Sequence, residues 1–212
     1  MVVFRSAKER PFAERKATID PHENRTVQHT IQQELKGVVT FVGIIWGVFL
    51  LDFVAPINLL AFGVTPRTTQ GLVGILASPF LHANLQHIVS NTLPLFVLLI
   101  LLAGSKARSW AVVAEIIVFS GLLLWLLGRP ATHVGASGLI FGLIAFLIVS
   151  GWMERRFVPL IISVIVTFLY GGVLLSGVMP RLGSHISWDG HLLGAIAGGI
   201  IAYLQTKRKL VA

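Results

Sequence analysis

The sequence predicts an all-α, polytopic membrane protein built as a bundle of six transmembrane helices. Of its 212 residues, 55% are hydrophobic and only 12% are charged, whereas soluble domains carry about 25% charged residues. The mean hydropathy is +0.82. Several apolar runs reach the roughly 18 residues that favour a bilayer over a globular core. A chain of this size has room for one helical domain and no second globular unit.

Six apolar segments with short connectors follow a basic N-terminal region. They cover residues 38–60, 85–103, 109–127, 137–152, 158–177 and 191–205. We therefore expect a basic cytosolic tail over 1–36, a transmembrane domain over 37–206 and a short basic C-terminus over 207–212. Val27, Ile31 and Leu35 recur at i, i+4 and i+8. The end of the tail is therefore expected either as a short amphipathic helix on the membrane surface or as a disordered segment.

The distribution of basic residues predicts the orientation of the chain. The net charge is +8, and 14 of the 17 Lys and Arg residues lie in the tail, the C-terminus and two connectors, 104–108 and 153–157. The other three connectors hold one Arg each. Because cytosolic loops are enriched in Lys and Arg, six spans with both termini in the cytosol fit every connector. We expect a multi-pass protein of the plasma membrane, specifically of a bacterial inner membrane. Its expected partner is the lipid bilayer and not nucleic acid. The absence of cysteine excludes a thiol nucleophile.

Four polar side chains fall at one depth of the predicted bundle. Counted from the cytosolic end of their spans, Asn91, His87, Ser137 and His191 lie 15 to 19 residues in, which is about 22–28 Å at 1.5 Å per residue. The hydrocarbon layer is about 30 Å thick. Polar side chains within spans are costly and mark function by default. The fourth segment is too short to cross the bilayer from Ser137, so we expect a helix that begins inside the membrane at the floor of a wet cavity.

These residue types suit acyl transfer. A serine hydroxyl needs an adjacent base, and His191 lies at matching depth. Small residues four apart, Gly138 and Gly142 on the fourth span and Gly194 and Gly198 on the sixth, allow the two helices to approach closely. The backbone N–H of Ser137 at a helix start is one oxyanion donor, and His87 and Asn91, on one face of the second span, could supply others. Taken singly, the serine could be an N-cap and the others interhelical hydrogen-bonding residues.

Other polar residues are expected to be structural. Asp189 resembles the N-cap of the sixth span, with a third catalytic member as the alternative. Asp52 is expected to be solvated at the outer end of the first span, and His133 and His185 are expected to be solvated in outer connectors. Glu115 lies inside the third span without an assigned role.

Three motifs resemble those of the rhomboid intramembrane serine proteases. They are Gly135-Ala136-Ser137-Gly138, the stretch from His82 through His87 to Asn91, and His191-Leu-Leu-Gly194-Ala-Ile-Ala-Gly198. They occur in the family's order on the second, fourth and sixth spans, and the resemblance covers about residues 38–205. It implies a catalytic dyad of Ser137 and His191, and an oxyanion hole that includes His87 and Asn91. It also implies cleavage of transmembrane protein substrates near the outer face, without metal or cofactor.

Two departures and two alternatives accompany this resemblance. Many rhomboids have a Trp-Arg pair in the loop before the second span, whereas this chain reads Gly71-Leu-Val-Gly74 with Arg67 as the nearest arginine. The residue before the family's histidine is commonly Ala and is Gly190 here. A catalytically silent rhomboid-like protein that binds membrane clients is one alternative. A small transporter or metal-binding membrane protein that uses His82, His87 and His191 is the other, weakened by the lack of a His-Glu-x-x-His motif.

Overall fold

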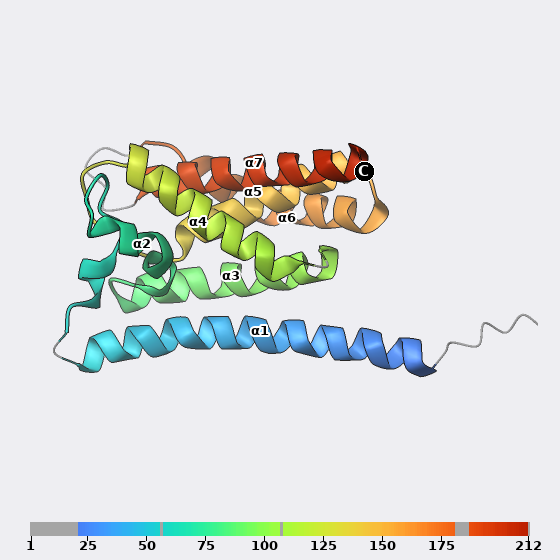
Figure 1. The fold of residues 1–212 in the computed structure, drawn as a ribbon, viewed down its shortest axis with the longest axis horizontal. Coiled ribbons are helices and arrows are strands. Elements are labelled where there is room, and N and C mark those ends of the chain that lie inside the picture. The colour runs from blue at the N-terminus through green and yellow to red at the C-terminus, as the bar shows by residue number, and fades with distance from the viewer. Residues whose placement is uncertain (1–20, 56, 107, 181–186, 212) are drawn as a thin grey trace, which may run out of the picture.

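The structure, a computed structural model, describes residues 21–55, 57–106, 108–180 and 187–211, and these residues form an all-helical bundle (Figure 1). In the described residues the only strand-like pairing is an isolated antiparallel bridge between Val64 and His133. The helices are α1 (Pro21–Val54), α2 (Gly71–Ala77), α3 (Leu85–Ser105), α4 (Ser109–Leu127), α5 (Ser137–Glu154), α6 (Phe157–Gly177) and α7 (Trp188–Val211), with short 3₁₀ turns η2 (Leu59–Phe62) and η3 (Ser78–Phe80).

Five helices of the described chain, α1, α3, α4, α5 and α6, are long and apolar enough to cross a membrane. Helix α7 has 24 residues and lies beside α5 in the bundle (Figure 1). Each of the six predicted segments therefore corresponds to one long helix. The prediction for the first segment was wrong at its outer end, because α1 ends at Val54 and the chain then turns into η2.

Helix α1 also begins earlier than the sequence suggested. It runs without a break from Pro21 to Val54, a length of 34 residues, so residues 21–36 are the first turns of this helix and not a separate surface helix or a disordered segment. Proline is well tolerated in the first turn of a helix, where its missing N–H would have no partner. No Gly or Pro interrupts residues 22–36, and local sequence therefore allows the helix to continue into the polar region.

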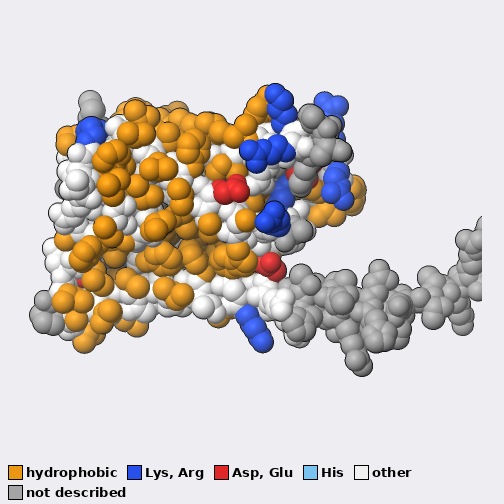
Figure 2. All heavy atoms as spheres, viewed as in Figure 1, with side chains coloured by type: hydrophobic (Ala, Val, Ile, Leu, Met, Phe, Trp, Pro, Cys, Tyr) orange, Lys and Arg blue, Asp and Glu red, His pale blue; other side chains and the backbone are white. Residues whose placement is uncertain are grey.

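The surface divides into an apolar middle and a basic end. Hydrophobic side chains cover the middle of the bundle, and most of the visible Lys and Arg side chains gather at one end, where the α3–α4 and α5–α6 connectors lie (Figures 1 and 2). Large exposed hydrophobic side chains include Phe168 at 87% and Leu93 at 68% exposure. Such a belt of exposed apolar surface is unfavourable in water and is favoured in lipid.

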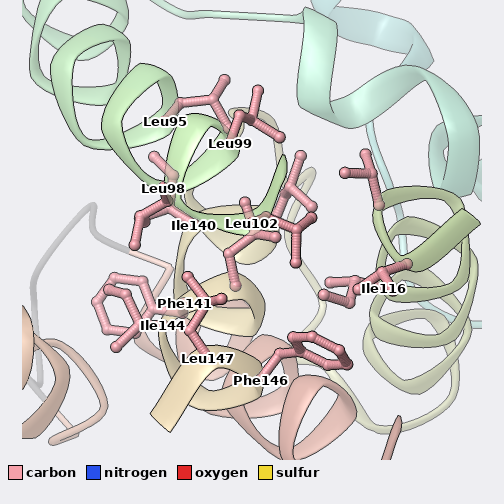
Figure 3. Close-up of a cluster of buried hydrophobic side chains, with 14 of the residues drawn as sticks. Leu95, Leu98, Leu99, Leu102, Ile116, Ile140, Phe141, Ile144, Phe146 and Leu147 are labelled. Carbon is pink, nitrogen blue, oxygen red and sulfur yellow. The ribbon is translucent and has the colours of Figure 1, made fainter. Parts of the chain in front are cut away.

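Helix α5 forms the centre of the apolar core. Eleven of its 18 residues are buried. Phe141, Ile144 and Leu147 belong to the same buried cluster as leucines of α3 (Figure 3). Because α5 is surrounded by neighbouring helices, it shows no clear polar face. Its position holds the beginning of the helix, at Ser137, inside the protein.

Helices α5 and α7 are in backbone contact through glycines. A Cβ atom added to Gly194 would overlap the carbonyl oxygen of Gly138, and one added to Gly198 would overlap that of Gly142. The expected close approach of these two helices through their small residues is confirmed. Lipid provides no hydrophobic force between helices, so van der Waals contact at such interfaces supplies much of the association energy.

The chain between α1 and α3 is fixed at two points. Asp52 is not simply solvated, because its carboxylate accepts a hydrogen bond from the N–H of Leu59, 2.7 Å away. The guanidinium of Arg67 donates to the carbonyl oxygens of Leu126 and Gly128, at 3.1 and 3.0 Å. A cation at a helix C-terminus satisfies unpaired carbonyl groups and interacts favourably with the helix dipole. The stretch that departs from the rhomboid Trp-Arg pattern forms α2.

Gly198→Ala tests the contact between α5 and α7. The added methyl group overlaps backbone, so we expect a loss of about 1–3 kcal/mol in the free energy of unfolding, which is typical of overpacking, and a fall of several degrees in Tm in detergent. Gly199→Ala is the matched control, since a Cβ at that position meets nothing within 4 Å. Equal melting temperatures for the two variants would show that the contact does not limit stability.

Candidate functional site

Ser137 is the first residue of α5, as predicted, and Gly135 determines how the chain reaches it. Gly135 has a φ of +114°, a conformation that side chains with a Cβ rarely adopt. A Cβ at this position would also lie 2.6 Å from two atoms of the His87 ring. Glycine is therefore required for backbone conformation and for space. Its N–H donates to the carbonyl oxygen of Ser78 at 2.9 Å, which fixes the loop against η3.

The imidazole of His191 is held on two sides. Its ring stacks on Phe141 with centroids 4.1 Å apart and an interplanar angle of 5°. Its Nδ1 lies 3.1 Å from the carbonyl oxygen of Gly177 at the end of α6. A carbonyl oxygen only accepts hydrogen bonds, so Nδ1 carries the proton in this contact. In the neutral ring the Nε2 atom is then the available base.

Helix α3 presents His87 and Asn91, and its start is capped by Asn84, whose side chain accepts the N–H of His87 at 2.9 Å. The Asn91 amide nitrogen lies 3.1 Å from Nε2 of His82. Burial, helped by nearby His87, lowers the pKa of His82 to about 4, so this ring is neutral and can accept the bond. One N–H of Asn91 is then held by His82, and the second can point to another acceptor.

One cavity brings the four predicted residues together. It has a volume of about 1040 Å³, and Ser137, His191, His87 and Asn91 all line it. Its walls also include Ser90 and Pro94 of α3 and Tyr170 of α6, so it extends between these two helices. The structure therefore brings the four residues together at one cavity.

Sequence reasoning missed two contacts of His191. Phe141 is four residues after Ser137, on the same face of α5, and this spacing could have identified it as a neighbour of the serine. The carbonyl of Gly177 gave no signal, because every residue carries one. Tyr170, on a cavity wall, was also not singled out.

Two expectations about outer polar residues were wrong. His133 is 5% exposed and contacts Ser187, so it is not solvated. Asp189 lies inside the first turn of α7, which begins at Trp188, and its carboxylate binds Arg129 and does not cap the helix. His185 lies outside the described residues.

Glu115 has a polar partner within the bundle. Its carboxylate accepts a hydrogen bond of 2.7 Å from the Gln205 amide, which joins α4 to α7. The described residues contain no group of three His, Asp or Glu side chains placed to hold a metal ion.

Comparison with known proteins gives a consistent result. The model of the Rhomboid domain matches residues 69–208. The chain is 45% identical over 177 residues to the uncharacterized protein Rv1337 of Mycobacterium tuberculosis, an alignment that covers 79% of this chain and 73% of that protein. It is 28% identical over 174 residues to a protein of Acanthamoeba polyphaga mimivirus named "Putative rhomboid protein L523", covering 78% of this chain and 90% of the viral one. With two thirds of its length matched by the domain, this chain belongs to the rhomboid family.

Proposed function

We propose that this rhomboid is an intramembrane serine endopeptidase that cleaves transmembrane segments of other membrane proteins near the outer face, with Ser137 and His191 as a catalytic dyad. The observation that supports it most is the shared cavity, in which a serine at a helix start, a held histidine and two further polar side chains line one space. Polar side chains within membrane spans are costly, so four of them at one cavity favour a functional site over four separate structural roles.

In this proposal Ser137 Oγ attacks the carbonyl carbon of the scissile peptide. Nε2 of His191 takes the serine proton and later gives it to the leaving amine. The hydrogen bond from Nδ1 to Gly177 favours the required tautomer, and the stacked Phe141 limits rotation of the ring. An acidic third member is not needed to orient the imidazole, since a backbone carbonyl performs that task here.

The tetrahedral intermediate carries a negative oxygen that needs donors. The N–H of Ser137 has no helical partner at the start of α5, where the dipole is also positive. Asn91 contributes an amide N–H whose orientation is set by His82, and His87 lies against the loop at Gly135. Donors fixed before the reaction stabilise the oxyanion without reorganisation.

The substrate is expected to enter between α3 and α6, whose residues line the cavity. A helical segment must unwind to expose a peptide bond, so sequences with small or helix-breaking residues near the outer face are favoured. Pro94, within α3, has no N–H to donate to the carbonyl of Ser90, and both residues line the cavity. The acyl-enzyme is then hydrolysed by water from the cavity.

Active-site labelling tests the dyad. A fluorophosphonate should label the purified wild type, and Ser137→Ala and His191→Ala should each abolish labelling and the cleavage of transmembrane reporter substrates. The double variant should be no worse than either single one, because the two residues act as a unit. Labelling retained in Ser137→Ala would contradict the serine mechanism. A wild type that neither labels nor cleaves would favour a client-binding role instead.

Asn91→Ala separates an oxyanion role from a structural one. Loss of one oxyanion donor should lower kcat by about 10²–10³-fold with little change in KM, since the charge exists only in the transition state. A residue that only joins α3 to His82 would instead lower Tm and leave kcat per folded molecule unchanged. Measuring kcat, KM and Tm on one detergent preparation decides between them.

We infer that α7 is the sixth span and that both termini are cytosolic. A helix of 24 residues is about 36 Å long, enough to cross the hydrocarbon layer. Because the chain lacks cysteine, single cysteines report sidedness directly. Thr69→Cys and Ala131→Cys should react with an impermeant thiol reagent added to intact cells, and Arg156→Cys should react only after lysis. Reaction of Arg156→Cys in intact cells would overturn this orientation.

A further inference from the structure

A polar cluster with a buried carboxylate and a buried imidazole joins the loop before Ser137 to the first turn of α7. The outer cluster, as we name it, consists of Arg129, His133, Ser187 and Asp189. The Asp189 carboxylate accepts two bonds from Arg129: the backbone N–H reaches Oδ2 at 2.9 Å and the guanidinium Nη2 reaches Oδ1 at 3.1 Å. The guanidinium also lies over the Trp188 ring, 5.1 Å from its centroid. Both ends of the Arg129 residue are therefore held by α7.

His133 makes a second connection between the same two elements. Its Nδ1 lies 2.7 Å from the Ser187 hydroxyl, and its Nε2 lies 3.1 Å from the carbonyl of Arg129 and 3.8 Å from the Asp189 carboxylate. Because the carbonyl oxygen of Arg129 only accepts hydrogen bonds, Nε2 of His133 carries the proton in this contact. The backbone of His133 is bridged to Val64 through two hydrogen bonds of 2.8 and 2.9 Å. The loop is thus held from α7 on one side and from the α1–α3 connection on the other.

The burial of Asp189 and His133 restricts the outer cluster to one arrangement. The side chains of Asp189 and His133 are 7% and 5% exposed. A buried carboxylate is tolerated only when donors surround it. Both oxygens of Asp189 are bonded, and Oδ1 also lies 3.3 Å from the Ser187 hydroxyl. A shift of the loop along α7 would break several of these bonds at once, so one relative position is strongly preferred.

The outer cluster acts on the two backbone segments that carry the dyad. The loop that starts at Gly128 leads directly to Ser137. On α7, the N–H of His191 donates to the carbonyl of Ser187 at 3.1 Å, and Asp189 is two residues before His191. Further along both helices from Ser137 and His191, the glycine contacts of α5 with α7 fix the distance between the helices. On the other side of the two residues, within the described residues, the outer cluster is the polar connection between the loop and α7.

We propose that Arg129, His133 and Asp189 are positioning residues that set the separation of Ser137 and His191 from the outer side. This inference rests on the proposed function. Catalysis depends steeply on such geometry, since a displacement of about 1 Å can cost about 10²-fold in rate. Asp189→Ala should therefore lower kcat by roughly 10- to 100-fold with KM changed less than about twofold. Arg129→Lys, which keeps the side-chain charge, should retain more activity than Arg129→Ala, which keeps only the backbone N–H bond to Asp189.

A thiol at position 137 gives a readout that does not require protease activity. In the Ser137→Cys variant, an adjacent His191 should stabilise the thiolate, so alkylation by iodoacetamide should show a pH midpoint below the value of about 8.5 for free cysteine. Adding His191→Ala should raise the midpoint. Adding Asp189→Ala should also raise it, to a smaller extent, and Asp189→Asn serves if the alanine variant does not fold.

The matched control is the buried ion pair at the opposite end of α5. Glu154, whose side chain is 8% exposed, pairs with Lys106, and it lies about 25 Å from Ser137 along the helix. Glu154→Gln should lower Tm without moving the thiol midpoint. An unchanged midpoint in Asp189→Ala, with a shift in His191→Ala, would make the outer cluster merely structural. An unchanged midpoint in His191→Ala would instead refute the dyad itself, and this inference with it.

Discussion

The backbone contact between α5 and α7 is the constraint on which the remaining structure depends. Ser137 and His191 lie near the N-terminal ends of these two helices, 54 residues apart in sequence, and the distance between them depends on how closely the helices approach. Glycines at 138, 142, 194 and 198 let carbonyl oxygens of one helix occupy the space of missing side chains on the other. In lipid, where apolar side chains gain little by meeting each other, this steric fit determines the pairing.

A second constraint is the cost of polar groups in a bilayer. Several polar side chains of this bundle are held by another protein group. Asn91 is paired with His82, Nδ1 of His191 with Gly177, Glu115 with Gln205 and Asp189 with Arg129. Such pairing satisfies these side chains, while Asn91 and His191 also line the cavity. The cavity and its polar walls are thus one feature, since neither is stable at this depth without the other.

Sequence alone predicted the long helices, and the four residues that it singled out line one cavity. Apolar runs are long in a membrane protein, and counting residues along a helix converts sequence position into depth. The contacts that hold the site were not predictable in this way. His133 looked like a solvated loop residue because its partner Ser187 is 54 positions away, and Asp189 looked like a cap because its partner Arg129 is 60 positions away. Only the folded chain brings such pairs together.

The unbroken length of α1 has a geometric consequence. The apolar span within it is Gln32–Val54, so the helix continues for eleven residues beyond the span, towards Pro21, a distance of about 16 Å. In Figure 1 this end extends past the ends of the neighbouring helices. The chain before Pro21 is therefore joined to the apolar span through about three continuous helical turns.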